Sequence, residues 1–221
     1  MTRTRYTADM MGLRESNLHR DLKSYYAYCH RGVIEEELCG YKIDVLAGRE
    51  IYEIQTKDFY RIREKIEDLL DEGYSVCVVY PVQGILEYED SAGRRRKRRK
   101  KHSPLKPFDE LVYIPNLLKR DGMQVEIVDL HERRTRKSKR NRVRKTRLVG
   151  VLGRRTISSP SDMLSLLPPD IPSKFTTRDI REVANVGKRL AGKVAYTLYH
   201  AGVASKIGHK NRYNLYELDS R

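Results

Sequence analysis

A strand pattern that determines the architecture lies in VIEEELCGYKIDVLAGREIYEIQT, residues 33–56. Polar and apolar residues alternate along it, and turn signals interrupt it at Gly40 and at residues 47–49. Alternation with a period of two is typical of half-buried strands, and short glycine turns join antiparallel neighbours. We therefore expect two or three antiparallel strands in this stretch.

Helical patterns and a buried strand flank this meander. Apolar side chains recur at three- and four-residue steps within residues 14–30 and again within residues 57–73, which predicts two helices. Residues 75–82, SVCVVYPV, form a continuous apolar run that is typical of a strand buried on both faces. The order helix, strands, helix, strand predicts a compact α/β unit with a mixed sheet over residues 1–90.

Charge is distributed very unevenly along the 221 residues. The chain holds 45 Lys and Arg against 30 Asp and Glu, a formal net charge of +15. Residues 1–90 carry a net −6 and residues 91–160 a net +17. A localised positive field of this kind indicates a polyanionic partner, above all nucleic acid. A solvated basic tail or a nuclear-localisation-like run is the alternative.

The middle of the chain, residues 91–158, is predicted to be a basic linker with a hairpin extension, or else to complete the core. Eight consecutive basic residues, 94–101, repel one another, and we expect them to stay unfolded without a counter-ion. Residues 108–121 look helical but are interrupted at Pro115. Two strand-like runs, residues 124–134 and 142–155, are joined by a basic tip and predict a long hairpin arm.

The last segment, residues 159–221, predicts a winged helix-turn-helix domain. A short helix is followed by two amphipathic helices, within residues 175–186 and 187–202, the first with an N-cap at Thr176 or Thr177. Two short alternating strands then surround the turn GHKNR, residues 208–212. Three helices and a small hairpin in this order are typical of winged-helix DNA binders, and also of winged helices that dock proteins.

Composition limits the location of the protein. No apolar run approaches the roughly 20 residues of a membrane span, and the first 16 residues lack the apolar stretch of a signal peptide. The three cysteines are odd in number and lack CxxC spacing. We therefore expect a cytoplasmic protein in a reducing compartment, without membrane contact.

Two carboxylates of the meander form the main candidate site. Asp44 precedes the tight turn at residues 47–49 and Glu53 follows it, so hairpin pairing brings the two side chains together. Neighbouring carboxylates repel unless a cation lies between them, and Mg²⁺ prefers oxygen ligands and keeps waters that can attack a phosphate. A polar outer face of the strand pair is the alternative.

Asp44, a gap of eight residues, and then Glu53-Ile54-Gln55 resemble the D…(D/E)-x-K signature of the PD-(D/E)xK nuclease superfamily. The resemblance covers about residues 12–82 and extends to prokaryotic proteins with an EIQT strand, a VYP strand end and a C-terminal winged helix. It implies a restriction-endonuclease-like core, a Mg²⁺ (or Mn²⁺) ion on Asp44 and Glu53, and further contacts from the Ile54 carbonyl and Glu15.

The sequence departs from the signature at Gln55, which stands where the family has lysine. The lysine positions or deprotonates the attacking water and stabilises developing negative charge. Gln55 can orient a water but carries no charge. Lys57, two residues on, is a candidate replacement, or alternatively an ordinary residue at the start of the next helix.

Several basic residues are predicted to contact nucleic acid. They belong to the basic run, the hairpin tip, the second helix of the C-terminal unit and its wing. They are Arg94, Arg95, Arg96, Lys97, Arg98, Arg99, Lys100, Lys101, Arg136, Lys137, Lys139, Arg140, Lys188, Arg189, Lys193, Lys210 and Arg212.

Together these features predict a Mg²⁺-dependent DNA endonuclease that cuts duplex or branched DNA. The rival is a non-catalytic DNA-binding protein, a regulator or accessory factor, on a degenerate nuclease fold; Gln55 favours this rival. RNA binding through the arginine-rich arm is a third hypothesis. The sequence leaves a homodimer open.

Overall fold

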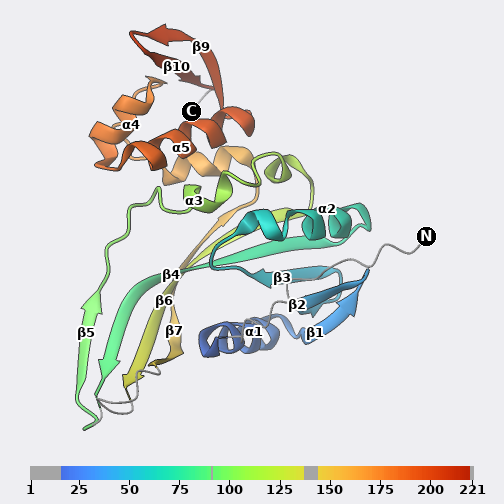
Figure 1. Ribbon diagram of the computed structural model, residues 1–221. Helices are drawn as coiled ribbons and strands as arrows, with labels where there is room; N and C mark the ends of the chain where they lie inside the picture. Colours follow the sequence, from blue (N-terminus) through green and yellow to red (C-terminus); the bar gives the residue numbers. More distant parts are fainter. Residues whose placement is uncertain (1–15, 91, 137–143, 220–221) are drawn as a thin grey trace.

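The computed structural model describes residues 16–90, 92–136 and 144–219 (Figure 1). Helices and strands alternate through the first half, as the patterns predict. The elements up to the basic run are α1 (Asn17–His30), β1 (Val33–Leu38), β2 (Tyr41–Ala47), β3 (Glu50–Ile54), η2 (Phe59–Arg61), α2 (Arg63–Asp71) and β4 (Ser75–Glu89). Those that follow are β5 (Arg95–Arg99), α3 (Phe108–Leu111), η3 (Leu117–Lys119), β6 (Met123–Arg136), β7 (Arg144–Ile157), η4 (Pro160–Leu166), β8 (Lys174–Phe175), α4 (Thr177–Ala184), α5 (Lys188–His200), β9 (Ala204–Lys210) and β10 (Tyr213–Leu218).

A mixed seven-stranded sheet forms the centre of the molecule. Its order is β1-β2-β3-β4-β6-β7, and β5 pairs with β4 beyond the end of β3. The contacts β3–β4 and β4–β6 are parallel, and the remaining pairs are antiparallel. Val76, Val78 and Val79 of β4 are fully buried. A strand buried on both faces needs such a continuous apolar run, and the run at 75–82 therefore predicts a central strand correctly. The predicted α/β class with a mixed sheet is confirmed.

The meander forms as its turn residues predict. Gly40 and Gly48 adopt φ of 77° and 64°, a left-handed conformation that favours glycine, and they lie in the turns β1–β2 and β2–β3. The three strands are antiparallel neighbours with Val45 opposite both Ile34 and Tyr52.

The sheet is covered on both faces. Leu22 and Tyr26 of α1 pack with Val79 and Val128 on one face. On the other face, α2 and α3 contribute to a larger core that also includes Leu198 of α5, so the C-terminal unit shares this core with the sheet (Figure 1). The segment from 123 to 157 supplies strands β6 and β7 to the same sheet as β1–β4.

Four strands continue past the helical layers as a ribbon, at the lower left of Figure 1. We call it the arm and define it as β5 with residues 85–89 of β4, 131–136 of β6 and 144–148 of β7. The expectation that the basic run stays unfolded is wrong for Arg95–Arg99, which form a strand. The physical reason is that glutamates of β4, opposite this strand, supply the counter-ions.

The C-terminal unit has α4 and α5 beside a three-stranded sheet of order β8-β10-β9. Thr176 caps α4 through its hydroxyl, and the Asp179 side chain accepts from the Thr176 N–H, which completes a capping box. The expected helix at 108–121 is reduced to one turn of α3 and the 3-10 turn η3, with Pro115 between them. Within the described chain, no helix combines the length and apolarity that crossing a bilayer requires.

Candidate active site

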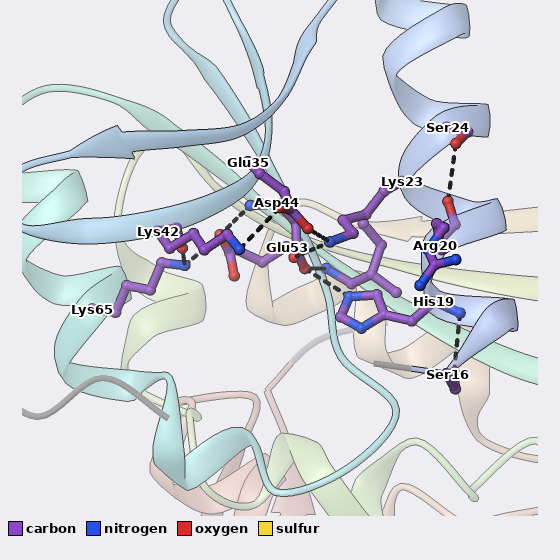
Figure 2. A network of polar contacts seen from close by, with 11 residues as sticks. Ser16, His19, Arg20, Lys23, Ser24, Glu35, Lys42, Asp44, Glu53 and Lys65 are labelled. Atoms are coloured by element: carbon purple, nitrogen blue, oxygen red, sulfur yellow. Dashed lines mark hydrogen bonds and ion pairs between the residues drawn. The ribbon is translucent and has the colours of Figure 1, made fainter. Parts of the chain in front are cut away.

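Asp44 and Glu53 lie side by side on β2 and β3, as the hairpin pairing predicts (Figure 2). The Asp44 backbone N–H donates to Glu53 Oε1 at 3.3 Å, and the Ile54 N–H donates to Asp44 Oδ2 at 2.9 Å. Each carboxylate is therefore held by the strand that carries the other. Both are shielded from solvent: the side chains are 19% and 7% exposed.

Cationic side chains from both flanking helices reach this pair. Lys65 of α2 donates to Glu53 Oε1 at 2.6 Å and to the Lys42 carbonyl at 2.5 Å. His19 Nε2 of α1 lies 3.0 Å from Asp44 Oδ2, and Lys23 Nζ lies 3.8 Å from Asp44 Oδ1. The carboxylate pair thus faces the junction of α1, α2 and the meander (Figure 2).

The sequence interpretation missed these cations. Lys65 is adjacent to Ile66 on the apolar side of α2, and His19 and Lys23 are four residues apart on α1 beside the buried Leu22. Charged residues at the edge of an apolar helix face are the available signal, but that signal is also common on solvated helices.

A third carboxylate, Glu35 of β1, lies across from Asp44 at a distorted point of the strand. Its φ of 62° is left-handed, which is uncommon for a residue with a side chain and marks local strain. Glu35 contacts Lys23, and Lys42 Nζ lies 2.9 Å from its other oxygen. The hydrogen bonds from Lys23 and Lys42 lower the pKa of Glu35 to about 2.

The pKa values of the two central carboxylates shift in opposite directions. Burial, which Lys65 opposes and the charge of Asp44 reinforces, raises the pKa of Glu53 to about 7. Burial acts the same way on Asp44, but the hydrogen bond and charge of His19, the Ile54 N–H and Lys65 together hold the pKa of Asp44 below its ordinary value. Two neighbouring acids that ionise at separate pH values are typical of a functional site.

Each of the two carboxylates keeps one oxygen that could bind a divalent cation. Asp44 Oδ1 and Glu53 Oε2 accept no hydrogen bond from the described residues. Among the described residues, the buried side-chain nitrogen and oxygen atoms that lack a hydrogen bond are His30 Nε2 and His131 Nε2. Asp44 Oδ1 and Glu53 Oε2 are not among these buried atoms, so the two oxygens keep solvent access. Mg²⁺ needs only one or two carboxylates because waters and phosphate complete its shell, so the pair fits that ion.

Additional ligands are not assembled around the pair. Across residues 16–90, 92–136 and 144–219, no group of three or more His, Cys, Asp or Glu is placed to hold a metal ion. Ile54 contacts Asp44 through its N–H. Glu15, the expected extra ligand, lies outside the described residues.

Gln55 and Lys57 follow β3 but contact neither carboxylate. Gln55 Nε2 donates to the Lys57 carbonyl at 2.6 Å. Lys57 is 74% exposed and lies 3.8 Å from Asp58. The cation beside Glu53 is therefore Lys65 from α2.

The predicted nucleic-acid residues fall into distinct environments. Arg94–Arg99, Lys100 and Lys101 are exposed, as are Lys188, Arg189, Lys210 and Arg212 of the C-terminal unit. Lys137, Lys139, Arg140 and the side chain of Arg136 lie outside the described residues.

Lys193 departs from the expectation of an exposed recognition helix. Its Nζ lies 2.8 Å from Asp109 Oδ1 and donates to the Asp109 carbonyl at 2.9 Å, and its side chain is only 16% exposed. This contact ties α5 to α3. Lys193 therefore fastens the C-terminal unit to the sheet layer, and it is not presented to a ligand.

The fold and site define an α/β protein with a mixed seven-stranded sheet and a paired-carboxylate centre at the meander. The family model "Domain of unknown function (DUF8091)" matches residues 16–162, and the chain belongs to that family. That match covers the sheet, the carboxylate pair and the arm. No curated protein matches the chain, and no solved structure matches it.

Proposed function

We propose that the protein is a divalent-cation-dependent nuclease of the PD-(D/E)xK type that hydrolyses phosphodiester bonds in DNA. The observation that carries the proposal is the interlocked pair of Asp44 and Glu53, with Lys65 against it. A strand pair has no need to keep two carboxylates together in a shielded position, whereas phosphoryl-transfer chemistry does.

The order of elements supports the same class. Helix α1, the three-strand meander, α2 and the buried β4 follow one another as in the restriction-endonuclease-like core that the signature implies. Both carboxylates occupy the meander, and α1 and α2 approach them from either side (Figure 2).

The side chains have separable roles in this mechanism. Asp44 and Glu53 would hold Mg²⁺, which supplies positive charge to the scissile phosphate and lowers the pKa of a bound water. Lys65 provides the cation that Gln55 lacks, and it stabilises negative charge developing on the phosphate. His19 holds Asp44 through Oδ2, so the carboxylate keeps its orientation.

Positive surface for the polyanion comes from elsewhere in the molecule. The arm carries the basic run. The C-terminal unit has two helices beside a sheet of order β8-β10-β9, an arrangement that winged-helix domains also have. Exposed Lys188, Arg189, Lys210 and Arg212 lie at the start of α5 and at the β9–β10 turn of this unit. Phosphate contacts of this kind give affinity that falls steeply with salt.

A non-catalytic DNA-binding protein is the second candidate. The observation that favours it is that Lys65, His19 and Lys23 already neutralise the carboxylates from within the chain. In that case the pair is a structural salt-bridge cluster, and the arm and C-terminal unit alone perform the function.

A cleavage assay with Mg²⁺ or Mn²⁺ on duplex, single-stranded and branched DNA decides between the two. Asp44→Asn and Glu53→Gln are each expected to lower the cleavage rate about 1,000-fold and to leave DNA affinity in EDTA unchanged. Lys65→Met is expected to lower the rate about 100-fold. Asp71→Asn and Glu182→Gln, two acids outside the site in surface ion pairs, are the matched controls. No cleavage by the wild type, or equal cleavage by all variants, contradicts the nuclease.

A further inference from the structure

The basic arm has two chemically different faces. Side chains alternate across a strand, so neighbouring residues of β5 project to opposite sides. On one side, Arg133 Nε lies 2.8 Å from Glu87 Oε1, Arg95 Nε lies 3.0 Å from Glu89 Oε2 and Lys97 Nζ lies 3.7 Å from Glu87 Oε2. We call this the acid-paired face, because its cations already have counter-ions within the chain.

The opposite side, which we call the Tyr88 face, carries arginines that flank an exposed tyrosine. Tyr88 is paired in register with Arg96 of β5 and with Arg134 of β6, so a ring lies between two guanidinium-bearing residues. Tyr88 is 42% exposed. Arg96 and Arg98 make no ion pair with any described residue, and Arg134 is 3.5 Å from Glu132.

A hollow of about 450 Å³ lies at the end of the arm where β4 leads into β5, and Tyr88, Arg96 and Arg134 of the Tyr88 face line part of it. Its walls are Tyr88, Glu89, Asp90, Arg94, Arg96, Arg134 and Thr135. The two acids in this set are already engaged, since Glu89 pairs with Arg95 and Asp90 with Arg94 at 2.7 Å. The volume lies within the range of small-molecule sites. The exposed Tyr88 ring and the Arg96 guanidinium, which makes no ion pair with a described residue, are available to a ligand, and Arg134 is held only by the 3.5 Å contact with Glu132.

An aromatic face flanked by arginines fits one class of ligand on this protein. Every nucleobase has a π-face that stacks on tyrosine, and guanidinium groups bind the phosphates on either side. In a duplex both faces of each internal base are covered by its neighbours. A base that stacks on Tyr88 therefore needs an uncovered face, which single strands, branch points and frayed ends provide most readily.

We propose that the Tyr88 face of the arm is a binding site for an unpaired DNA base, which stacks on Tyr88 while Arg96 and Arg134 contact the adjoining phosphates. This inference rests on the proposed function only in taking the ligand to be DNA. Helix α1 contacts both the arm and the carboxylate pair: its Asp21 accepts from Arg147 Nε of the arm at 2.7 Å, while His19 of the same helix contacts Asp44. The substrate class is DNA that contains a single-stranded segment.

A fluorescence titration in EDTA tests the site without any need for cleavage. The probe is a single-stranded 20-nucleotide DNA with one 2-aminopurine, whose emission is quenched when the base stacks. The full-length wild type is expected to quench it, Tyr88→Phe to behave like the wild type, and Tyr88→Ala to bind about tenfold more weakly without quenching. Quenching by Tyr88→Ala equal to that of the wild type, or none by the wild type, overturns the proposal.

Two matched double variants separate the faces. Replacing Arg96 and Arg134 with Gln is expected to reduce the slope of log affinity against log salt by about 1.4, for two phosphates of a single strand. Replacing Arg95 and Lys97 with Gln is expected to reduce that slope less, because their charges are already paired with Glu89 and Glu87, and to lower the melting temperature. An equal loss of slope in both pairs contradicts the two-face assignment.

The outcomes remain distinct from those of the cleavage assay. A wild type that quenches in EDTA but never cuts with Mg²⁺ keeps the base site and rejects the nuclease. Cleavage that depends on Asp44, together with a silent Tyr88→Ala, keeps the nuclease and rejects the base site. Tighter binding of an RNA of the same sequence rejects DNA as the ligand of this face.

Discussion

Two buried glutamates, Glu53 at the candidate active site and Glu87 in the arm, behave in opposite ways. Both are almost sealed from solvent, with 5% and 2% of their surface exposed. Burial raises the pKa of Glu53 to about 7, in spite of Lys65. The hydrogen bond from Arg133, with the charges of Arg133, Lys97 and Arg95, lowers the pKa of Glu87.

At Glu87 the neighbouring cations outweigh burial, whereas at Glu53 burial outweighs the single lysine, so the two pKa values shift in opposite directions. Glu87 has three Arg or Lys groups within 3.7 Å of its oxygens, namely Arg95, Lys97 and Arg133. Glu53 has one lysine and a second acid, Asp44, beside it. The first arrangement is complete and holds strands together. The second still benefits from added positive charge, and a metal ion can supply it.

Replacing each glutamate with glutamine should affect the melting temperature differently, and this is the largest expected difference between the two positions. Glu87→Gln leaves Arg95, Lys97 and Arg133 gathered around a neutral amide, so we expect a melting temperature lower by several degrees at pH 8. Glu53→Gln relieves the repulsion with Asp44 and keeps the hydrogen bond of Lys65 to the Lys42 carbonyl. We expect its melting temperature in EDTA at pH 8 to be unchanged or raised.

Thermal unfolding by circular dichroism measures both variants under identical conditions. Arg178, in an exposed pair with Glu182, gives a control in Glu182→Gln, which should stay near the wild type. Equal destabilisation by Glu53→Gln and Glu87→Gln would mean that both glutamates are structural.

The raised pKa of Glu53 also predicts a smaller effect, a dependence of stability on pH. The folded pKa of Glu53, about 7, exceeds the ordinary 4.5, so the folded protein holds this proton more tightly than the unfolded chain. The contribution of Glu53 to stability is therefore lost as pH rises from about 4.5 to about 7. Relative to the wild type in EDTA, Glu53→Gln should gain on the order of 2 kcal/mol over that window. A constant difference from pH 4.5 to 8 would contradict the raised pKa.

Much of the sheet follows from the local sequence. Alternation and turn glycines place β1–β3, and the apolar run at 75–82 places the buried part of β4. Because a hairpin fixes its own register, the juxtaposition of Asp44 and Glu53 was predictable from the turn at 47–49 and is confirmed. The long hairpin of β6 and β7 was predictable for the same reason.

Contacts between distant segments were not predictable from the sequence. Lys65 reaches Glu53 because α2 crosses the meander, and Lys193 reaches Asp109 because α5 packs on α3. The strand at Arg95–Arg99 depends on the parity that places Glu87 and Glu89 opposite it. Each of these contacts depends on how distant segments pack together. A sequence pattern shows which residue types are present but not which partners they contact.

Calorimetric titration of the protein with Mg²⁺ at pH 7.5, without DNA, tests directly whether Asp44 and Glu53 hold a metal ion. The carboxylate pair predicts one bound ion, release of the proton that Glu53 partly holds at this pH, and loss of binding in Asp44→Asn and Glu53→Gln but not in Glu87→Gln. Binding that survives both site variants, or the absence of any Mg²⁺ binding by the wild type, would contradict a metal site between Asp44 and Glu53.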